Sequence, residues 1–495
     1  MRLLFLFLVT SSSLVFCQNE DDMLRLMQTD FHGTGRTDAM AGSFGALGAD
    51  ISAIQINPAG MGRYSSSQIA FSLHNNFTNS TGNYSEVTEL TSSNDISIGS
   101  VGIVLTGDAS TENKGRVFRQ FTFSYNRLKN FNNTRSYQGQ NFNSLLDFFA
   151  ADGNGIQLEG DDIFYARPFT TGIGLDTEAI FYSPDDISYY PNLTDGDMYH
   201  NREIAQKGGM GEFHIGYSEN FINQLYWGIS VGIRNVNFEH YISHQETLLE
   251  PVAPPFWSTL ESFIYEEELT INRRGYNVKG GIIYLPKEEL RLGFAYESPT
   301  IHNLKETFTT TMTAFHKDKE MTVPNHLIPF SEFGYRVRTP MKLRGSIAYI
   351  YDQRGAINFD VELMHYGRGR FSAEPTGFYG NYDFAFENSI ISDVFRPVAN
   401  LRIGGELLIT KELFIRGGFA FLHNPFKRSI IDDLSANTTY ALGLGWQKNR
   451  INIDLAYRYH THFEDYYAFN IGDLANRVVF TNNSHIVTLS VNYRL

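Results

Sequence analysis

Apolar and polar residues alternate through most of the chain. In the final segment, HIVTLSVNYRL, the apolar residues Val487, Leu489 and Val491 alternate with the polar residues Thr488 and Ser490. Successive side chains of a β-strand point to opposite faces, so this period of two predicts strands with one apolar and one polar face. The pattern predicts about 14 strands, at 66-77, 94-106, 118-128, 209-219, 224-241, 263-285, 290-312, 335-351, 356-366, 395-409, 412-422, 437-447, 451-462 and 484-495.

Strand length and loop length distinguish the two architectures that fit this pattern. A soluble sandwich turns its apolar faces inward, whereas a membrane barrel turns them outward to lipid. The predicted strands run to roughly 10 residues or more, while soluble strands average about 5 to 6. Short connections also alternate with long ones: 219-224, 286-289, 352-355, 410-411 and 448-450 are short, and 129-208, 313-334, 367-394 and 463-483 are long. Short periplasmic turns and long external loops are typical of outer-membrane proteins. We therefore expect an all-β fold, with a closed antiparallel transmembrane β-barrel at 66-495.

Charged residues in the middle of the predicted strands fall on the polar faces. They are Arg344, Asp360, Glu362, Arg402, Glu406, Arg416, Asp454 and Arg458. A wet lumen would accommodate these charges, which supports a barrel whose polar faces point inward.

The composition excludes several other classes of protein. Of the 495 residues, 42% are hydrophobic, 14% are aromatic and only 19% are charged. No internal apolar run approaches the roughly 18 to 20 residues that a membrane-spanning helix requires. The formal net charge of -14 disfavours nucleic acid as a partner, because binding to phosphates needs a basic surface.

The first residues, MRLLFLFLVTSSSLVFCQ, have the pattern of a secretory signal peptide. Arg2 supplies the positive start, and Leu3 to Val9 supply the apolar core. We expect cleavage near Cys17, so that 1-17 is removed; acylation of Cys17 is the alternative. Because Cys17 is the only cysteine, a mature chain without it has neither a disulfide nor a cysteine ligand for a metal.

Residues 18-65 precede the first predicted strand and show no strand period. A short helix is plausible around Asp21 to Gln28, and seven glycines follow before position 65. Glycines allow tight turns and close approach to a wall, and Pro58 stiffens the chain by fixing its φ angle. We therefore expect a compact plug, or hatch, inside the lumen.

The glycine-rich stretch GTGRTDAMAGSFGALGADISAIQINPAGMGRY resembles the start of the FadL/TodX family of outer-membrane transporters for hydrophobic compounds. The residues that carry this resemblance, about 30 in extent, include Gly35, Arg36, Gly42, Asp50, Asn57, Pro58, Ala59 and Gly60. The family often has two acidic residues where this chain has Ala49-Asp50, which is a small departure. The resemblance implies a barrel of 14 strands with an N-terminal hatch in its lumen. The signal ending near Gln18 and the aromatic-rich strands also resemble Bacteroidetes-type envelope proteins.

The resemblance implies a passive route for hydrophobic molecules. They would be captured among the outer loops, enter a pocket in the lumen, and leave sideways through a kinked strand after the hatch shifts. In this chain, the loop 129-208 is the candidate capture element. Its segment NFNSLLDFFA has the spacing of a short amphipathic helix, with the apolar side chains Phe142, Leu145, Leu146, Phe148 and Phe149. The alternative is that this helix caps the barrel and packs on its own loop. The segment VAPPFW in loop 242-262 is a second candidate.

No catalytic residue, cofactor or metal site is expected. His240 and His244 are four apart, but at a strand end that spacing does not place both on one helical face. His460 and His462 share a strand face but lack a third ligand. The stretch GTGRTDAMAG lacks the P-loop lysine, so phosphate binding is not expected there.

Three functions remain open. The first is an outer-membrane barrel for passive uptake of small hydrophobic molecules such as fatty acids or aromatics. Its partners would be lipid, lipopolysaccharide and the solute. The second is a structural or docking subunit of a larger outer-membrane complex, which the many luminal charges and the long loops would suit. The third is a diffusion porin for polar solutes.

Overall fold

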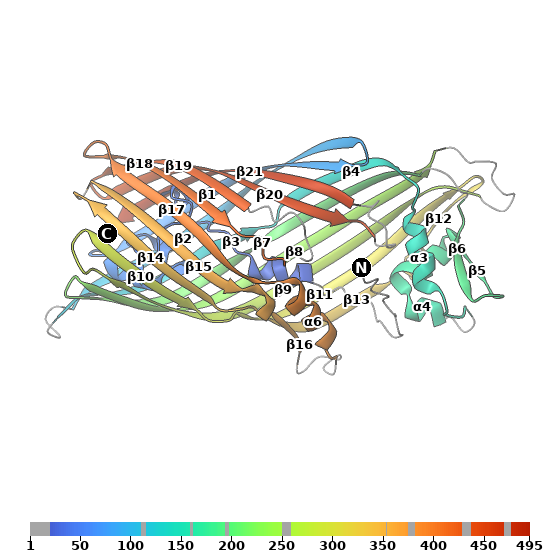
Figure 1. Cartoon of the computed structure of the whole chain (residues 1–495), viewed down its shortest axis with the longest axis horizontal. Helices are drawn as coiled ribbons and strands as arrows, with labels where there is room; N and C mark the ends of the chain where they lie inside the picture. Colours follow the sequence, from blue (N-terminus) through green and yellow to red (C-terminus); the bar gives the residue numbers. More distant parts are fainter. Residues whose placement is uncertain are drawn as a thin grey trace, which may run out of the picture.

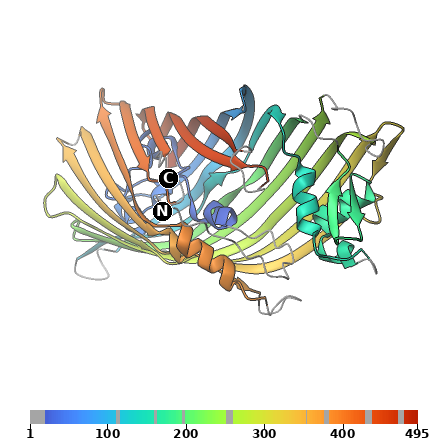
Figure 2. The same cartoon turned by 45° about the vertical axis from the view of Figure 1, so that its right-hand side comes forward.

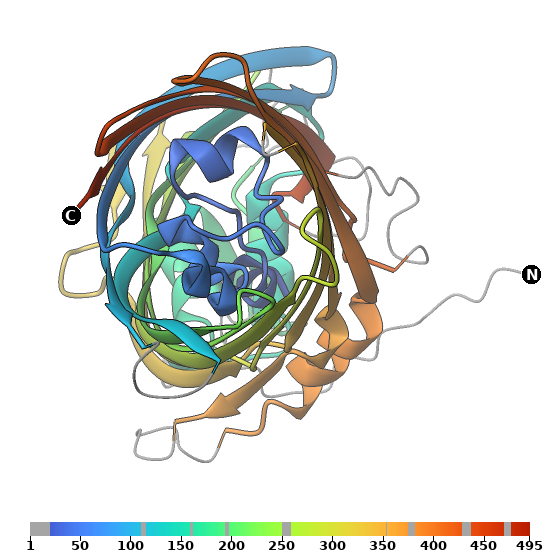
Figure 3. The ribbon, with the colours of Figure 1, turned by 90° about the vertical axis from the view of Figure 1, so that its left-hand side faces the viewer.

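The computed structural model describes residues 20–109, 115–158, 162–193, 198–249, 259–352, 354–374, 382–427, 437–469 and 477–495. Its main feature is a closed antiparallel barrel of fourteen strands (Figures 1 and 3). The wall begins with β1 (Gln68–Tyr84), β2 (Val87–Asp108), β3 (Arg116–Asn130) in line with β4 (Asn133–Asn141), β7 (Met198–Phe221), β8 (Leu225–Leu248), β9 (Leu260–Tyr284) and β10 (Leu290–Glu297) in line with β11 (Ile301–His316). It continues through β13 (Phe330–Arg338) in line with β14 (Lys342–Tyr351), β15 (Gly355–His365) followed by β16 (Arg370–Ala373), β17 (Pro397–Leu408), β18 (Leu413–Leu422), β19 (Asn437–Lys448), β20 (Ile451–Tyr467) and β21 (Arg477–Arg494).

The barrel closes where β1 pairs with β21. This pairing runs from Gln68 opposite Arg494 to Asn83 opposite Val479. Closure gives every strand two neighbours and removes the exposed sheet edges that a membrane would not tolerate. The predicted fold class, the strand count and the antiparallel arrangement are therefore confirmed.

Two barrel strands are interrupted where the sequence places a proline. Pro299 lies between β10 and β11, and Pro340 lies between β13 and β14. Proline has no backbone N–H and cannot donate to the ladder, so each of these strands is divided into two pieces. The short strand β12 (Lys319–Thr322) forms a hairpin on β11 beyond the break.

The strands near the N-terminus are longer than predicted. The segment 78–93 was expected to be a connection, but β1 continues to Tyr84 and β2 begins at Val87. Likewise, β4 and the first part of β7 lie within 129-208, which was expected to be a loop. These extensions carry mostly polar side chains, so they lack the apolar face that the sequence pattern detects. These extensions remain strands because their backbone groups pair with neighbouring strands.

The two ends of the barrel differ in the length of their connections. At the end that we call the turn end, β7 and β8 are joined through residues 222–224, β17 and β18 through 409–412, and β19 and β20 through 449–450. The opposite loop end carries α3 (Leu145–Gly153), α4 (Asp162–Ala166), η4 (Pro168–Gly172), α5 (Ile173–Asp176), β5 (Ile180–Ser183) and β6 (Ser188–Pro191), seen as the teal group in Figure 2. The connection between β15 and β17 holds η5 (Tyr366–Arg368) and α6 (Ala385–Val394) beside the wall.

A belt of exposed apolar side chains surrounds the outer face nearer the turn end. Every barrel strand contributes to it, through Ile69, Ile98, Phe121, Phe213, Ile229, Ile282, Phe294, Ile347, Phe359, Ile403, Ile415, Leu442, Leu455 and Leu489. Inward positions on the same strands are mostly polar or glycine. An apolar exterior around a polar interior is the inverse of a soluble sandwich and is the surface of a membrane-spanning barrel.

The N-terminal segment, residues 20–64, lies inside the barrel, where it appears in blue in Figure 3. It consists of α1 (Glu20–Met27), α2 (Gly35–Ala39), η1 (Ile51–Gln55) and η2 (Pro58–Arg63). Nearly all of its side chains are buried. Among the residues that the structure describes, no helix is long and apolar enough to cross a membrane.

Candidate functional site

The N-terminal segment folds through two capped turns that use the glycine-rich motif. Asp50 caps η1 by accepting from Ser52 N (3.0 Å), and it also accepts from the Thr34 hydroxyl (2.6 Å). Asn57 caps η2 by accepting from Ala59 N (3.1 Å), and Pro58 occupies the first turn, where its missing N–H is not needed. These residues therefore shape the segment in the lumen.

Side chains of the N-terminal segment also pair with the inner wall. Arg36 Nε donates to Glu406 Oε2 on β17 (3.0 Å). The Thr488 hydroxyl on β21 donates to Asp38 Oδ2 (2.7 Å), and Gly35 N donates to Ser490 Oγ (2.9 Å). Bonds to several strands at once hold the segment in one position.

Glycines on the wall make room for this contact. A Cβ added at Gly281 would overlap Asn57 Oδ1, and one added at Gly418 would overlap the backbone of Met40. Asn57 Nδ2 also donates to Ile282 O (3.3 Å). The wall is therefore shaped to fit the N-terminal segment closely.

Between the middle of the lumen and the turn end, buried charges form what we call the charged belt. It consists of Glu212, Arg234, Lys279, Glu297, Arg344 and Glu362, which lie on adjacent strands from β7 to β15. Lys279 Nζ lies 2.6 Å from Glu212 Oε2, Arg234 Nη2 lies 2.6 Å from Glu297 Oε1, and Arg344 Nε lies 2.7 Å from Glu362 Oε2. Of the predicted inward charges, Arg344 and Glu362 belong to the charged belt, whose members pair with one another and are almost completely shielded from water.

On the loop-end side of the charged belt, apolar side chains fill the lumen around α1. This luminal cluster includes Met23, Leu26 and Met27 of α1, Val236 and Phe238 of β8, Leu269 and Ile271 of β9, Leu304 of β11 and Tyr335 of β13. The guanidinium of Arg25 stacks on the Phe238 ring, 3.8 Å from its centroid. Helix α1 therefore occupies the apolar part of the lumen.

A second apolar cluster closes the loop end. It joins Leu145, Leu146 and Phe149 of α3 to Phe263 and Tyr265 of β9 and to Met312 of β11, among others. The inward side chains of β9 continue from Phe263 and Tyr265 of this cluster to Leu269 and Ile271 of the luminal cluster. Glu267 lies between them on the same face, with its Oε1 3.9 Å from Arg202 Nη2, so two apolar clusters follow one another along β9 with one ion pair between them.

The five candidate capture residues divide into two groups. A helix forms as predicted, with Ser144 and Asp147 making a capping box at its start. Leu145, Leu146 and Phe149 are buried, and Phe148 packs at the edge of the same cluster. Phe142 precedes the helix and is 80% exposed. The second candidate, VAPPFW, lies outside the described residues.

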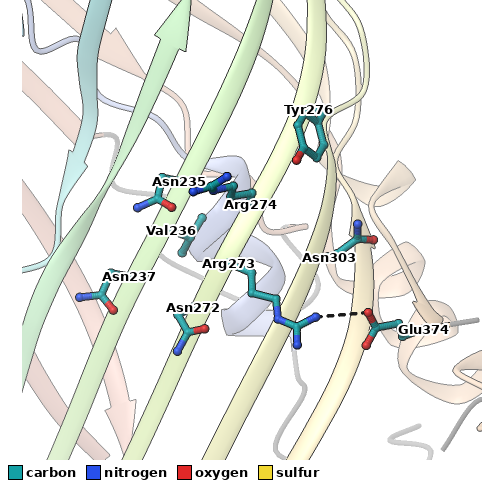
Figure 4. A pocket seen from close by; sticks show the side chains of 9 residues that line it. All are labelled: Asn235, Val236, Asn237, Asn272, Arg273, Arg274, Tyr276, Asn303 and Glu374. Carbon is teal, nitrogen blue, oxygen red and sulfur yellow. Dashed lines mark hydrogen bonds and ion pairs between the residues drawn. The ribbon is translucent and has the colours of Figure 1, made fainter. Parts of the chain in front are cut away.

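The outer wall carries a hollow beside Arg273 of β9. Arg273 has a φ of +125°, and the three consecutive side chains Asn272, Arg273 and Arg274 are all exposed, so the alternation of exposed and buried side chains is interrupted there without a shift in strand register. A cavity of about 600 Å³ lies at this point, lined by Asn235, Val236, Asn237, Asn272, Arg273, Arg274, Tyr276, Asn303 and Glu374 (Figure 4). Val236 belongs both to this lining and to the luminal cluster, so it separates the hollow from the interior.

The predicted histidine pairs behave differently from one another. His460 and His462 bond to Thr439 Oγ1 (3.0 Å) and Asn437 Oδ1 (2.8 Å). His244 is found beside His200 and Glu246, a grouping that the sequence reasoning missed. The available signal was the spacing of His244 and Glu246, which are two apart and therefore share one face of a strand.

No family model and no curated protein sequence matches the chain. Its structure is similar to that of a Pseudomonas aeruginosa FadL homologue, with a TM-score of 0.56 and 13% identity over 94% of this chain and 98% of that chain. It is also similar to the P. putida toluene transporter TodX, with a TM-score of 0.51 and 14% identity over 94% of this chain and 99% of that chain. A deltaS2 mutant of the TodX monoaromatic hydrocarbon channel gives a TM-score of 0.53 and 14% identity over 94% of this chain and 100% of that chain. At these identities the likeness shows a shared fold, and it gives no support to a Bacteroidetes origin.

Proposed function

We propose that this chain is an outer-membrane barrel for the passive uptake of small hydrophobic molecules. The observation that carries the proposal is the pair of apolar clusters that follow one another along β9, the loop-end cluster and, past Glu267, the luminal cluster around α1. Solved structures with the same fold are described as a toluene transporter and a monoaromatic hydrocarbon channel. Two such clusters suit a solute such as a fatty acid or a monoaromatic compound, because such a solute gains from leaving water.

The N-terminal segment acts as the hatch. Met23, Leu26 and Met27 fill the apolar part of the lumen, so a solute must displace them to advance. Four hatch motif residues, Gly35, Arg36, Asn57 and Pro58, bond to the wall, and the other four, Gly42, Asp50, Ala59 and Gly60, make hydrogen bonds within the segment. We assign residues 18-65 to this hatch, 66-495 to the barrel, and 1-17 to the cleaved signal that directs export.

The solute leaves through the side of the barrel. The charged belt and the rest of the hatch lie between the luminal cluster and the turn end. An apolar molecule would have to cross fully buried ion pairs to pass them. The irregular position at Arg273 lies on the loop-end side of that barrier and beside Val236, which forms the inner boundary of the outer hollow (Figure 4). Separation of β8 from β9 at this point opens the luminal cluster toward lipid.

Capture begins at the loop end. Phe142 is exposed just before α3, while Leu145, Leu146, Phe148 and Phe149 lead from it into the loop-end cluster. A solute that adsorbs at Phe142 enters the cluster when α3 moves. Lipid and lipopolysaccharide surround the barrel, and the proposal requires neither a cofactor nor a chemical reaction.

The docking-subunit alternative is less well supported. It drew on the luminal charges, but Glu362, Arg344 and Glu406 pair within the barrel or with the hatch and are not presented to a partner. The paired belt also disfavours a porin for polar solutes, since its charges do not line an open channel.

Uptake into liposomes tests the proposal. The full chain is expected to accelerate entry of a monoaromatic or fatty acid but not of a sugar of similar size. A matched control is the same chain with Val236 replaced by Trp, which fills the partition beside the hollow. Accelerated entry of the sugar, or no acceleration for either hydrophobic solute, would contradict the proposal.

A further inference from the structure

Two histidines and a glutamate meet on the inner face of the wall near the loop end. His200 lies directly opposite Glu246 in the pairing of β7 with β8. His244 lies two residues before Glu246 on the same strand and therefore on the same face. The strand register, and not a helix, brings the three side chains together.

The three groups are fully buried and converge on one point. One ligand atom from each lies within 4.8 Å of the other two. Glu246 Oε1 lies 2.8 Å from His244 Nε2 and 3.6 Å from His200 Nε2. A tetrahedral zinc ion with bonds of about 2.0 to 2.2 Å would hold its ligand atoms roughly 3.3 Å apart, between these two distances.

His200 also has a nitrogen available for a ligand. Its Nε2 atom is buried without a hydrogen-bond partner among the described residues. Its Nδ1 atom lies 3.1 Å from the Tyr84 hydroxyl, which in turn accepts from Asn141 Nδ2 (2.6 Å). Metal-binding histidines are commonly oriented by such a hydrogen bond to the second ring nitrogen.

We propose that His200, His244 and Glu246 bind a divalent transition-metal ion of the Zn²⁺ type. Two imidazoles and one carboxylate favour Zn²⁺ or its transition-metal neighbours over Ca²⁺ and Mg²⁺, which prefer oxygen ligands. To coordinate through Nε2, His244 carries its proton on Nδ1, an atom that makes no hydrogen bond to any described residue. The proposal does not depend on the transported solute.

The site has a structural consequence for the loop end. Glu246 Oε1 accepts from Leu145 N (2.7 Å), and Glu246 Oε2 accepts from Ser144 Oγ (2.5 Å), so the same carboxylate holds the start of α3. An ion bound to Glu246 fixes that carboxylate between β7 and β8. The metal therefore fastens α3 to the wall and makes the loop-end cluster more rigid.

The test uses the untagged full chain in detergent, dialysed against a chelator and then titrated with ZnCl₂. We expect one ion per chain by elemental analysis, saturable binding by calorimetry, and a rise in the temperature of unfolding. X-ray absorption at the zinc edge should show the scattering of two imidazoles. Absence of saturable binding, or a zinc spectrum without imidazole scattering, overturns the proposal even if no variant can be folded.

Variants locate the ion. His200→Gln and His244→Gln are each expected to abolish stoichiometric binding, whereas His302→Gln, another fully buried histidine on β11, should retain it. Tyr84→Phe should preserve the stoichiometry and weaken binding about 10-fold, because it removes only the orienting hydrogen bond. Stoichiometric binding that survives both the His200 and the His244 substitutions overturns the assignment.

Discussion

Arg36 of the N-terminal segment donates to Glu406 on the inner wall, with 3.0 Å between Nε and Oε2, and Arg36 Nη1 also donates to Ala49 O (3.2 Å). One side chain thus fastens two parts of the segment to β17. Arg36 Nη2 also donates to Glu406 Oε1 (2.5 Å), so Arg36→Ala removes three bonds. Among the described residues, Glu406 then keeps its pair with Arg416, whose Nε lies 3.2 Å away. The hatch should lose about 1 to 3 kcal/mol of docking free energy.

We expect this loss to appear as leakage of a polar dye through Arg36→Ala in liposomes. A suitable control is Lys448→Ala, which breaks the exposed ion pair of Lys448 with Glu412 (3.5 Å) at the same end of the barrel. Exposed pairs contribute little, so this variant should leak no more than the natural chain. Equal leakage from both variants would show that Arg36 does not hold the hatch.

Two adjacent glycines of β9 provide a variant and its control for testing how closely the hatch fits the wall. Gly281→Ala places a methyl group against Asn57 Oδ1, whereas Gly280→Ala meets nothing within 4 Å. We therefore expect Gly281→Ala to displace the Asn57 turn and speed proteolysis within residues 20–64, while Gly280→Ala leaves the rate unchanged. Identical proteolysis rates would mean that the wall does not grip the segment at this turn.

The sequence pattern predicted the barrel because lipid imposes an apolar outer face on each strand. It predicted strands where side chains such as Ile229 and Leu489 face lipid, and it stopped where that face becomes polar, as beyond Phe77 on β1. The breaks at Pro299 and Pro340 follow from missing donors, but the positive φ of Arg273 has no such marker in the sequence.

Less of the candidate site than of the fold could be predicted from the sequence. Of the charged belt, the sequence pattern placed Arg344 and Glu362 on the inner face, but the pairing of the belt depends on the register of adjacent strands, which no local pattern specifies. The grouping of His200 with His244 and Glu246 depends on the register of β7 with β8, because His200 and Glu246 lie near the far ends of the two arms of this long hairpin. Only the spacing of His244 and Glu246 is local.

A disulfide across the hollow tests the lateral route. Asn237 and Asn272 are register partners in the pairing of β8 with β9, and both line the hollow. With both replaced by Cys, oxidation should lower hydrophobic uptake several-fold and reduction should restore it, because the two strands can no longer separate. The control pair, Ser243→Cys with Glu266→Cys, links the same strands nearer the loop end and should have no effect. Unimpaired uptake through the oxidised Asn237–Asn272 pair would rule out this exit.

The capture residues can be separated from the packing residues by comparing two substitutions. Phe142→Ser alters a side chain that is 80% exposed, so we expect unchanged stability and slower uptake at low solute concentration. Leu146→Ala alters a fully buried side chain and should destabilise the loop end by about 2 to 5 kcal/mol through the cavity that it leaves. Uptake kinetics and chemical denaturation measure the two effects. Normal uptake by Phe142→Ser would favour a role for α3 in capping alone.

The charged belt should be far more important for stability than the ion pairs of the loops. Glu212→Gln removes the carboxylate that lies 2.6 Å from Lys279 Nζ and 3.3 Å from Arg234 Nε, and it leaves both cations buried with fewer partners. Breaking a buried pair by removing one member typically costs about 3 to 5 kcal/mol. Glu178→Gln is the matched control, since Glu178 pairs with Lys319 in the exposed loops and should change the free energy of unfolding by less than about 0.5 kcal/mol. Denaturant titration of both variants in detergent measures the difference. A paired belt requires a large loss of stability from Glu212→Gln and a low ion conductance of the natural chain. If the belt charges were instead hydrated in an open channel, both substitutions would change the free energy of unfolding only slightly, and the barrel would conduct ions freely.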